Sequence, residues 1–283
     1  MEPDKSYLQV AELAKKLGLS DDQIAREILQ AKLLSAMFRG HARQVILKGG
    51  LAMRQIYQSP RLTKDVDLSA APGISTAAVA KTIMTAIDSA LQSGFLEDFK
   101  VTAPKQTDVT QRWKVNGRIS GGESAVQLTI EVSHRGVPPE EHIATMIAAP
   151  MFDHQASPAI VQVFTPIALA ASKVAALVDP KRNAPRDVYD LDVLVSMRVE
   201  PPVKLLAGMG SESLGRSLDR LWGKLEILDW KLARSELRNF LPLPVMEMLD
   251  EEEWDAMRLR VGTEVERWLD DAKRLAGGSD DKG

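Results

Sequence analysis

Apolar residues recur every three or four positions near the N-terminus, which is the spacing of one face of an α-helix. Gly18 separates two such runs. They are Val10, Leu13, Ala14 and Leu17, and then Ile24, Ile28, Leu29 and Leu33. Ser20 followed by Gln23 is typical of a capping box, in which side chains satisfy free N–H groups at a helix start. The pattern therefore predicts two helices joined by a turn, the second beginning near Ser20.

Short apolar runs and strict alternation follow between residues 44 and 133, and both indicate β-strands. A buried strand is predicted for QVILKGG, a helix for residues 51–57, a second strand for KDVDLSA and a helix for residues 75–94. DVTQRWKVNGRIS and SAVQLTIEVSHRG are predicted to pair as strands. In the last segment Val126, Leu128, Ile130 and Val132 share one face, and Gln127, Thr129, Glu131 and Ser133 share the other.

Helical spacing dominates from Pro166 almost to the C-terminus. Helices are expected over residues 167–178 and 186–197, and a core-facing stripe is formed by Trp254, Met257, Val261, Val265 and Trp268. Because the predicted strands lie in the first half of the chain and helices dominate the second, we expect an α+β fold with a small mixed sheet. We expect one region over residues 1–150 and a mainly helical one over 151–283, with a soft boundary between 151 and 166.

Composition narrows the possible functions. The chain has 283 residues, of which 45% are hydrophobic and 27% charged, and its net charge is -3. That charge argues against coating nucleic acid by bulk attraction, but it leaves a local basic patch possible. The absence of cysteine excludes disulfides and thiolate chemistry. No signal-peptide pattern or membrane-length apolar run is visible, so we expect a cytoplasmic protein without membrane contact. The four histidines have no metal-ligand spacing.

The candidate chemistry lies around a glycine pair and three acids. Gly49 and Gly50 stand where a strand meets a helix, a place at which backbone can approach phosphate oxygens closely. Asp65 and Asp67 share one face of a strand, and paired carboxylates of this kind suit Mg²⁺. Glu131 lies on the polar face of a later strand. If the two strands are neighbours, three carboxylates converge, as metal-assisted phosphoryl transfer requires.

Two separated blocks resemble a known family. The first is LKGGLAMR with RLTKDVDL, and the second is ALAASKVAALVDPKRNAPRDVYDLDVL. In this order they resemble the polymerase-β-type nucleotidyltransferase core, and more narrowly the AbiEii/AbiGii toxin family. The resemblance covers roughly residues 24–195. The family's third acid is often Asp, whereas Glu131 occupies that place here.

The resemblance implies a role for each matching residue. Phosphates and nucleotide would be bound by Lys48, Gly49, Gly50, Arg54, Thr63, Arg186 and Asp190, with Arg54 alternatively pairing with an acid. Mg²⁺ or Mn²⁺ would be held by Asp65, Asp67 and Glu131. The catalytic residues would be Asp65, Asp67, Lys173 and Asp187, and Lys173 would reach the triphosphate.

The implied activity is a Mg²⁺-dependent transfer of a nucleoside monophosphate from an NTP to an acceptor hydroxyl, with release of pyrophosphate. The resemblance also implies a toxin of a type IV toxin–antitoxin or phage-defence system, with a separately encoded antitoxin and the tRNA 3′ end as a plausible acceptor. Two alternatives stay open. The acceptor could be a protein hydroxyl, or KKLGLSDDQIAREI could be a helix-turn-helix of a non-catalytic nucleic-acid-binding protein. The basic loop PKRNAPR could contact a nucleic-acid phosphate or be simply solvated.

Overall fold

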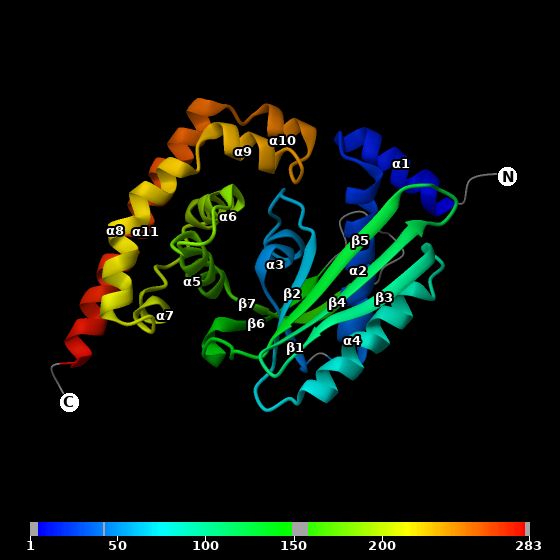
Figure 1. Cartoon of the computed structure of the whole chain (residues 1–283), viewed down its shortest axis with the longest axis horizontal. Coiled ribbons are helices and arrows are strands. Elements are labelled where there is room, and N and C mark those ends of the chain that lie inside the picture. Colours follow the sequence, from blue (N-terminus) through cyan, green and yellow to red (C-terminus); the bar gives the residue numbers. More distant parts are fainter. Residues whose placement is uncertain (1–4, 42, 149–157, 281–283) are drawn as a thin grey trace. The chain divides into compact units, whose positions relative to one another are not determined.

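The computed structural model describes residues 5–41, 43–148 and 158–280, and they fall into two compact units (Figure 1). The first comprises Met1–Phe164 with Pro242–Pro244, and the second Thr165–Leu241 with Val245–Gly283. The boundary expected between residues 150 and 151 lies outside the described residues, as does His154. The structure divides the chain between Phe164 and Thr165.

A seven-stranded mixed sheet forms the centre of the first unit, in the order β3-β4-β5-β2-β1-β7-β6. Its strands are β1 (Val45–Leu47), β2 (Asp65–Ala70), β3 (Leu96–Gln106), β4 (Thr110–Ile119), β5 (Ala125–Ser133), β6 (Ile143–Ala148) and β7 (Ala159–Phe164). The pairs β2–β5 and β1–β7 are parallel, and the other neighbours are antiparallel. The α+β plan is confirmed, with a larger sheet than the alternation alone predicts.

Three strands lie where no strand was predicted: β3, β6 and β7. In β3 most side chains after Leu96 are at least partly exposed, two register shifts interrupt its pairing with β4, and Pro104 lies within it. Because β3 is an edge strand, it can tolerate proline and needs no strict alternation. Its sequence therefore lacks the period that identifies β4 and β5.

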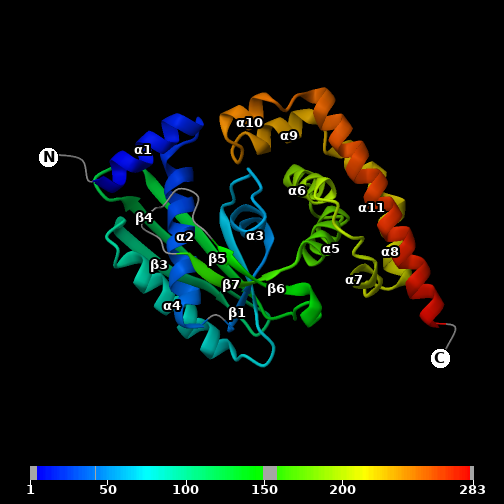
Figure 2. The ribbon, with the colours of Figure 1, turned by 180° about the vertical axis from the view of Figure 1, so that it is seen from behind.

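Helices of the first unit pack on the sheet and on one another. They are α1 (Lys5–Leu17), α2 (Asp21–His41), α3 (Gly49–Gln55) and α4 (Thr76–Leu91), with a short 3₁₀ turn at Glu140–His142. Figures 1 and 2 show α2 and α4 on the same side of β3, β4 and β5. The inward residues of β5 are at most 2% exposed, as the alternation predicts. The polar residues of these strands occupy the opposite face.

The helix-turn-helix interpretation of the first two helices is wrong for a physical reason. A recognition helix must present its side chains to the major groove. Here every residue from Ile24 to Ala31 is buried, because α2 packs against β5, β7 and α4. The expected cap is half formed: the Gln23 side chain accepts a hydrogen bond from the Ser20 N–H at 2.7 Å, while the Ser20 hydroxyl bonds to neighbouring side chains.

The second unit is helical throughout its described residues. It contains α5 (Pro166–Leu177), α6 (Pro185–Ser196), α7 (Val203–Ala207), α8 (Ser211–Ile227), α9 (Trp230–Leu237) and the long α11 (Glu251–Asp280). The short helix α10 (Leu243–Glu247) begins with residues assigned to the first unit and ends with residues assigned to the second. The predicted stripe on α11 is buried, with Trp254 and Trp268 at most 1% exposed. In the part of the chain that the structure describes, no helix is long and apolar enough to cross a membrane.

Candidate active site

The glycine turn between β1 and β2 is built against an aspartate. Lys48 is extended, and its N–H donates to the Asp67 carbonyl at 3.0 Å. Gly49 follows with φ +65°, a conformation that favours glycine. A Cβ at Gly49 would stand 2.6 Å from Asp67 Oδ2 and 2.9 Å from Asp67 Cβ. Only glycine leaves room for the Asp67 side chain here, so turn and carboxylate are fixed together.

Glycine is needed at position 50 for a similar steric reason. A Cβ there would lie 2.9 Å from Thr63 Oγ1 and 2.9 Å from Arg61 Nη2. The chain before β2 thus packs directly on the glycine pair and sets the Thr63 hydroxyl beside it. The helix predicted over residues 51–57 begins two residues earlier, so both glycines belong to the first turn of α3.

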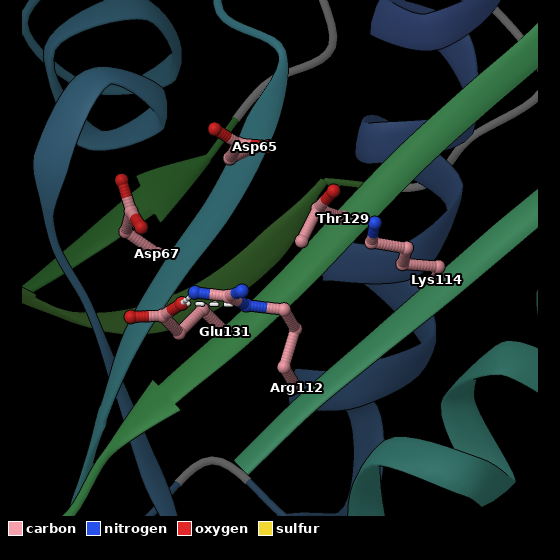
Figure 3. Close-up of a pocket in the computed structure, with 6 residues that line it drawn as sticks. All are labelled: Asp65, Asp67, Arg112, Lys114, Thr129 and Glu131. Atoms are coloured by element: carbon pink, nitrogen blue, oxygen red, sulfur yellow. Dashed lines mark hydrogen bonds and ion pairs between the residues drawn. The ribbon is translucent and has the colours of Figure 1, made fainter. Parts of the chain in front are cut away.

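The three predicted acids lie on one face of two adjacent strands. In the parallel register of β2 and β5, Asp67 is opposite Glu131 and Asp65 is opposite Thr129. Val66, between the two aspartates, is fully buried on the other face. Figure 3 shows Asp65, Asp67 and Glu131 around a pocket of about 250 Å³. The conditional expectation that β5 neighbours β2 is therefore met.

Two basic residues of the pocket were not predicted from the sequence. Arg112 and Lys114 of β4 line it with Thr129 (Figure 3). Arg112 is opposite Glu131 in the β4–β5 register and donates to its Oε2 from Nε at 2.9 Å and from Nη2 at 2.5 Å. The available signal was their alternation with the buried residues Trp113 and Val115, which indicates the polar face but not its neighbours.

Lys48 lies in the electrostatic field of the same acids. Burial lowers the pKa of its ammonium, the nearby carboxylates of Asp67 and Glu131 oppose that effect, and the charge of Arg135 adds to it. The net direction is downward. A lysine with a lowered pKa beside a carboxylate cluster is a common feature of functional sites.

Arg54, expected to support phosphates or pair with an acid, is 3% exposed and bonds to protein groups. Its guanidinium donates to both carboxylate oxygens of Glu27, at 2.9 and 3.2 Å, and to the carbonyls of Ser59 and Pro60 at 3.1 Å. Burial raises the pKa of Glu27, and the charge of Arg54 opposes the rise. In this structure Arg54 braces α3 against α2 rather than lining the pocket.

Other polar residues of α2 brace the site in the same way. Gln30 donates to the Thr63 carbonyl at 3.1 Å, and Arg26 donates to the Gln127 carbonyl on β5 at 2.9 Å. With Glu27, they connect this helix to the three chain segments that form the pocket and its glycine turn. The sequence pattern gave no sign of this role, because it identified only the apolar stripe of α2.

The carboxylates fit a magnesium ion shared with a polyphosphate. Among the described residues, no three His, Asp or Glu side chains are grouped closely enough to hold an ion alone. Glu131 is engaged by Arg112, which leaves Asp65 and Asp67 as the principal carboxylates. Mg²⁺ is usually bound through one or two carboxylates, with phosphate oxygens and water completing its octahedron. The donor set has the right chemistry for that arrangement.

A second cluster of predicted residues lies within the helical unit. Lys173 Nζ on α5 is 3.1 Å from Asp187 Oδ1 and 2.6 Å from Asp190 Oδ2, both on α6. The two carboxylates are at most 1% exposed. Arg182, in the basic loop before α6, also pairs with Asp187, at 2.5 Å. Lys224 on α8 holds that loop through the Arg182 carbonyl, at 2.5 Å.

Arg186 does not join this cluster. Its guanidinium pairs with Glu236 on α9 at 3.1 Å and lies 5.8 Å from the centre of the Phe240 ring. The nucleotide-binding role expected for Arg186 stays a prediction.

Comparison with known proteins decides the family. The model of the AbiEii nucleotidyltransferase toxins, of type IV toxin–antitoxin systems, matches residues 32–274. The chain belongs to the AbiEii family. AbiEii membership makes it a nucleotidyltransferase, and it implies an NTP substrate and an antitoxin. The family match begins inside α2, after Arg26, Glu27 and Gln30.

Solved structures share the AbiEii chain's fold. A protein of H. pylori with the provisional description nucleotidyltransferase is 18% identical, with a TM-score of 0.57, over 91% of this chain and 99% of that one. JHP933 from Helicobacter pylori is 16% identical, with a TM-score of 0.56, over 93% and 98% of the two chains. No protein of curated function matches the sequence.

Proposed function

We propose that this AbiEii-family chain transfers a nucleoside monophosphate from an NTP to the 3′ end of tRNA in a reaction that depends on Mg²⁺ or Mn²⁺. One observation supports it above the others. Asp65, Asp67 and Glu131 share one sheet face, and the glycine turn packs directly on Asp67. An acidic face beside an open backbone turn suits a metal-bound triphosphate.

The proposed reaction is an in-line displacement at the α-phosphorus. The acceptor hydroxyl oxygen forms a bond to that phosphorus, the bond to the bridging α–β oxygen breaks, and pyrophosphate leaves with the electron pair. The hydroxyl proton passes to solvent or to a nearby carboxylate. Mg²⁺ would supply charge neutralisation and alignment when bound to Asp65 and Asp67.

The protein's own groups have separate tasks in this proposal. The turn at Gly49 and Gly50 takes the β- and γ-phosphates, with Lys48 and Thr63 beside them. Lys173 and its two aspartates are included because they match the family's second block, and we propose that transfer requires them too. Arg54 contributes by bracing α3. The cytoplasm, where NTP and tRNA occur together, is the proposed site of action. We propose that the transfer arrests growth and that the antitoxin prevents this arrest.

The test uses purified protein, Mg²⁺, total tRNA and each α-³²P-labelled NTP in turn. We expect label on tRNA from one or more NTPs, lost when Mg²⁺ is chelated and lost in Asp67→Asn. Asp88→Asn, at an exposed position of α4, is the matched control and should keep full activity.

Two results would contradict the proposal. Label on protein instead of RNA would make the chain a protein-modifying nucleotidyltransferase. Equal labelling by wild type and Asp67→Asn would remove the acidic face from the mechanism.

A further inference from the structure

A row of cations continues the polar sheet face beyond the acids. In the strand registers Asp67 is opposite Glu131, Glu131 is opposite Arg112, and Arg112 is opposite Lys105. The adjacent rows place Lys114 opposite Thr129 and Lys100 opposite Asn116. Residues opposite each other share a face. We call this set of Lys100, Lys105, Arg112 and Lys114 the basic strip.

The lysines of the basic strip are available to a ligand. Lys100 is exposed, and Lys105 and Lys114 are half-buried. Among the described residues, no carboxylate pairs with any of the three, whereas Arg118 on the same strand as Lys114 pairs with Glu97 and Asp98. Arg112 is shared with Glu131 at the edge of the pocket. The three lysines therefore form a positive surface without a paired carboxylate, on a chain whose net charge is -3.

The position of the strip separates it from the glycine turn. The strand order β3-β4-β5-β2-β1 places the strip on one side of the acids and the turn that follows β1 on the other. Neighbouring strands are about 4.8 Å apart, so β4 and β3 lie about 10 and 14 Å from β2. Two surfaces suited to phosphate thus flank one acidic centre.

We propose that the basic strip binds the phosphodiester backbone of the RNA acceptor, leading its 3′ end to the acids. This inference rests on the proposed function and names the surface that its acceptor occupies. A triphosphate at the glycine turn needs no second cationic surface, whereas a polynucleotide acceptor brings further phosphates behind its reacting end. Lysine and arginine on an open strand face bind such phosphates without reading sequence.

The experiment measures RNA binding and transfer separately. The strip variant is Lys100→Gln/Lys105→Gln/Lys114→Gln, which leaves Arg112 and its pair with Glu131 intact. The matched control is Lys15→Gln/Lys16→Gln/Lys81→Gln, at exposed lysines of α1 and α4, with the same change in net charge. Binding of fluorescein-labelled tRNA is followed by anisotropy in an Asp67→Asn background, and thermal unfolding confirms that each variant folds.

We expect the strip variant to bind tRNA about tenfold or more weakly, and the slope of log K against log salt to fall by about two, since each phosphate contact to a single strand contributes about 0.7. In the active background, KM for tRNA should rise by a larger factor than KM for NTP, because Lys100 and Lys105 lie outside the pocket and only Lys114 lines it. The control variant should match wild type in all three measurements.

Three outcomes would overturn the inference: equal weakening in both variants, unchanged tRNA binding in the strip variant, or a rise in KM for NTP alone. If the label appears on an acidic protein instead, and only when the basic strip is intact, then that protein and not RNA is the ligand of the strip. If wild type binds tRNA through the strip but transfers no label, the strip stands and the proposed reaction fails.

Discussion

At the residue scale, the site depends on a contact between a glycine and an aspartate. Gly49 and Asp67 belong to different elements, and the sequence motif does not show that they touch. The structure shows that a single methyl group at Gly49 would displace the Asp67 carboxylate. Gly49 is therefore required by the metal-ligand candidate as well as by the phosphates that the glycine turn is proposed to bind.

Gly49→Ala should reduce transfer about 100-fold, the order of loss expected when a reacting group is misplaced by about 1 Å. Gly73→Ala is the matched control, because Gly73 has φ +76° but a Cβ added there would meet nothing within 4 Å. Both changes force a residue into a left-handed conformation at a cost of about 1–2 kcal/mol. Transfer assays with urea denaturation separate the two effects, and equal activities would show that the Asp67 contact is irrelevant.

Lys48 gives a pH-dependent prediction. Its folded-state pKa lies below the ordinary value of 10.5, so the unfolded chain binds more protons between the two values. The free energy of unfolding of wild type should therefore rise with pH as 10.5 is approached, relative to Lys48→Met. Urea denaturation at intervals from about pH 8 upward measures this difference. Parallel curves for the two proteins would show that the pKa of Lys48 is unchanged by folding.

At the scale of elements, the sequence predicted those whose period is strong. Alternation identified β4 and β5 and the buried side of β5, and helical spacing identified α4, α5, α6 and α11. What alternation cannot give is which strand lies beside which. The β2–β5 pairing joins segments far apart in the chain and decides that Glu131 meets Asp67. The same limit hid Arg112 and Lys114, which look like ordinary solvated strand residues until their neighbours are known.

The helix-turn-helix error has the same origin. Local sequence shows that α2 is a helix after a glycine turn, but it does not show what covers it. The covering sheet makes Glu27 and Gln30 internal braces of the site. The first family block contains Arg54 and so predicted it as a site residue, but Glu27, the buried partner of Arg54, lies outside that block.

Arg54→Met should lower the free energy of unfolding by about 3–5 kcal/mol, because it leaves the Glu27 carboxylate buried without its partner. The double variant Arg54→Met/Glu27→Gln should be less destabilised than Arg54→Met alone, since it also removes the uncompensated charge. Guanidinium denaturation of wild type, Arg54→Met, Glu27→Gln and the double variant tests this. Additive losses in the double variant would contradict a coupled pair.

At the scale of the whole molecule, each unit contains one cluster of family-matched residues. The first holds Asp65 and Asp67, and the second holds Lys173 with its two aspartates. The net charge of -3, known from the sequence, argues against binding of nucleic acid by bulk electrostatic attraction. Only the sheet register shows where a local positive surface lies.

Expression of wild type in a bacterium without the antitoxin should arrest growth, and Asp67→Asn or Lys173→Met should each relieve the arrest. Arg274→Gln is the control, because its pair with Asp270 is exposed and contributes little. Growth curves with immunoblots for protein level measure the effect. Arrest by a folded Lys173→Met protein would exclude the second cluster from the activity.

The place of β3 at the edge of the sheet has a consequence for solution behaviour. An edge strand of 11 residues presents unpaired backbone groups that another chain could extend. Charged lysines are a common protection against such pairing. We therefore expect Lys100 and Lys105 to oppose edge-to-edge pairing as well, and a variant that neutralises both to form intermolecular sheet more readily at high protein concentration.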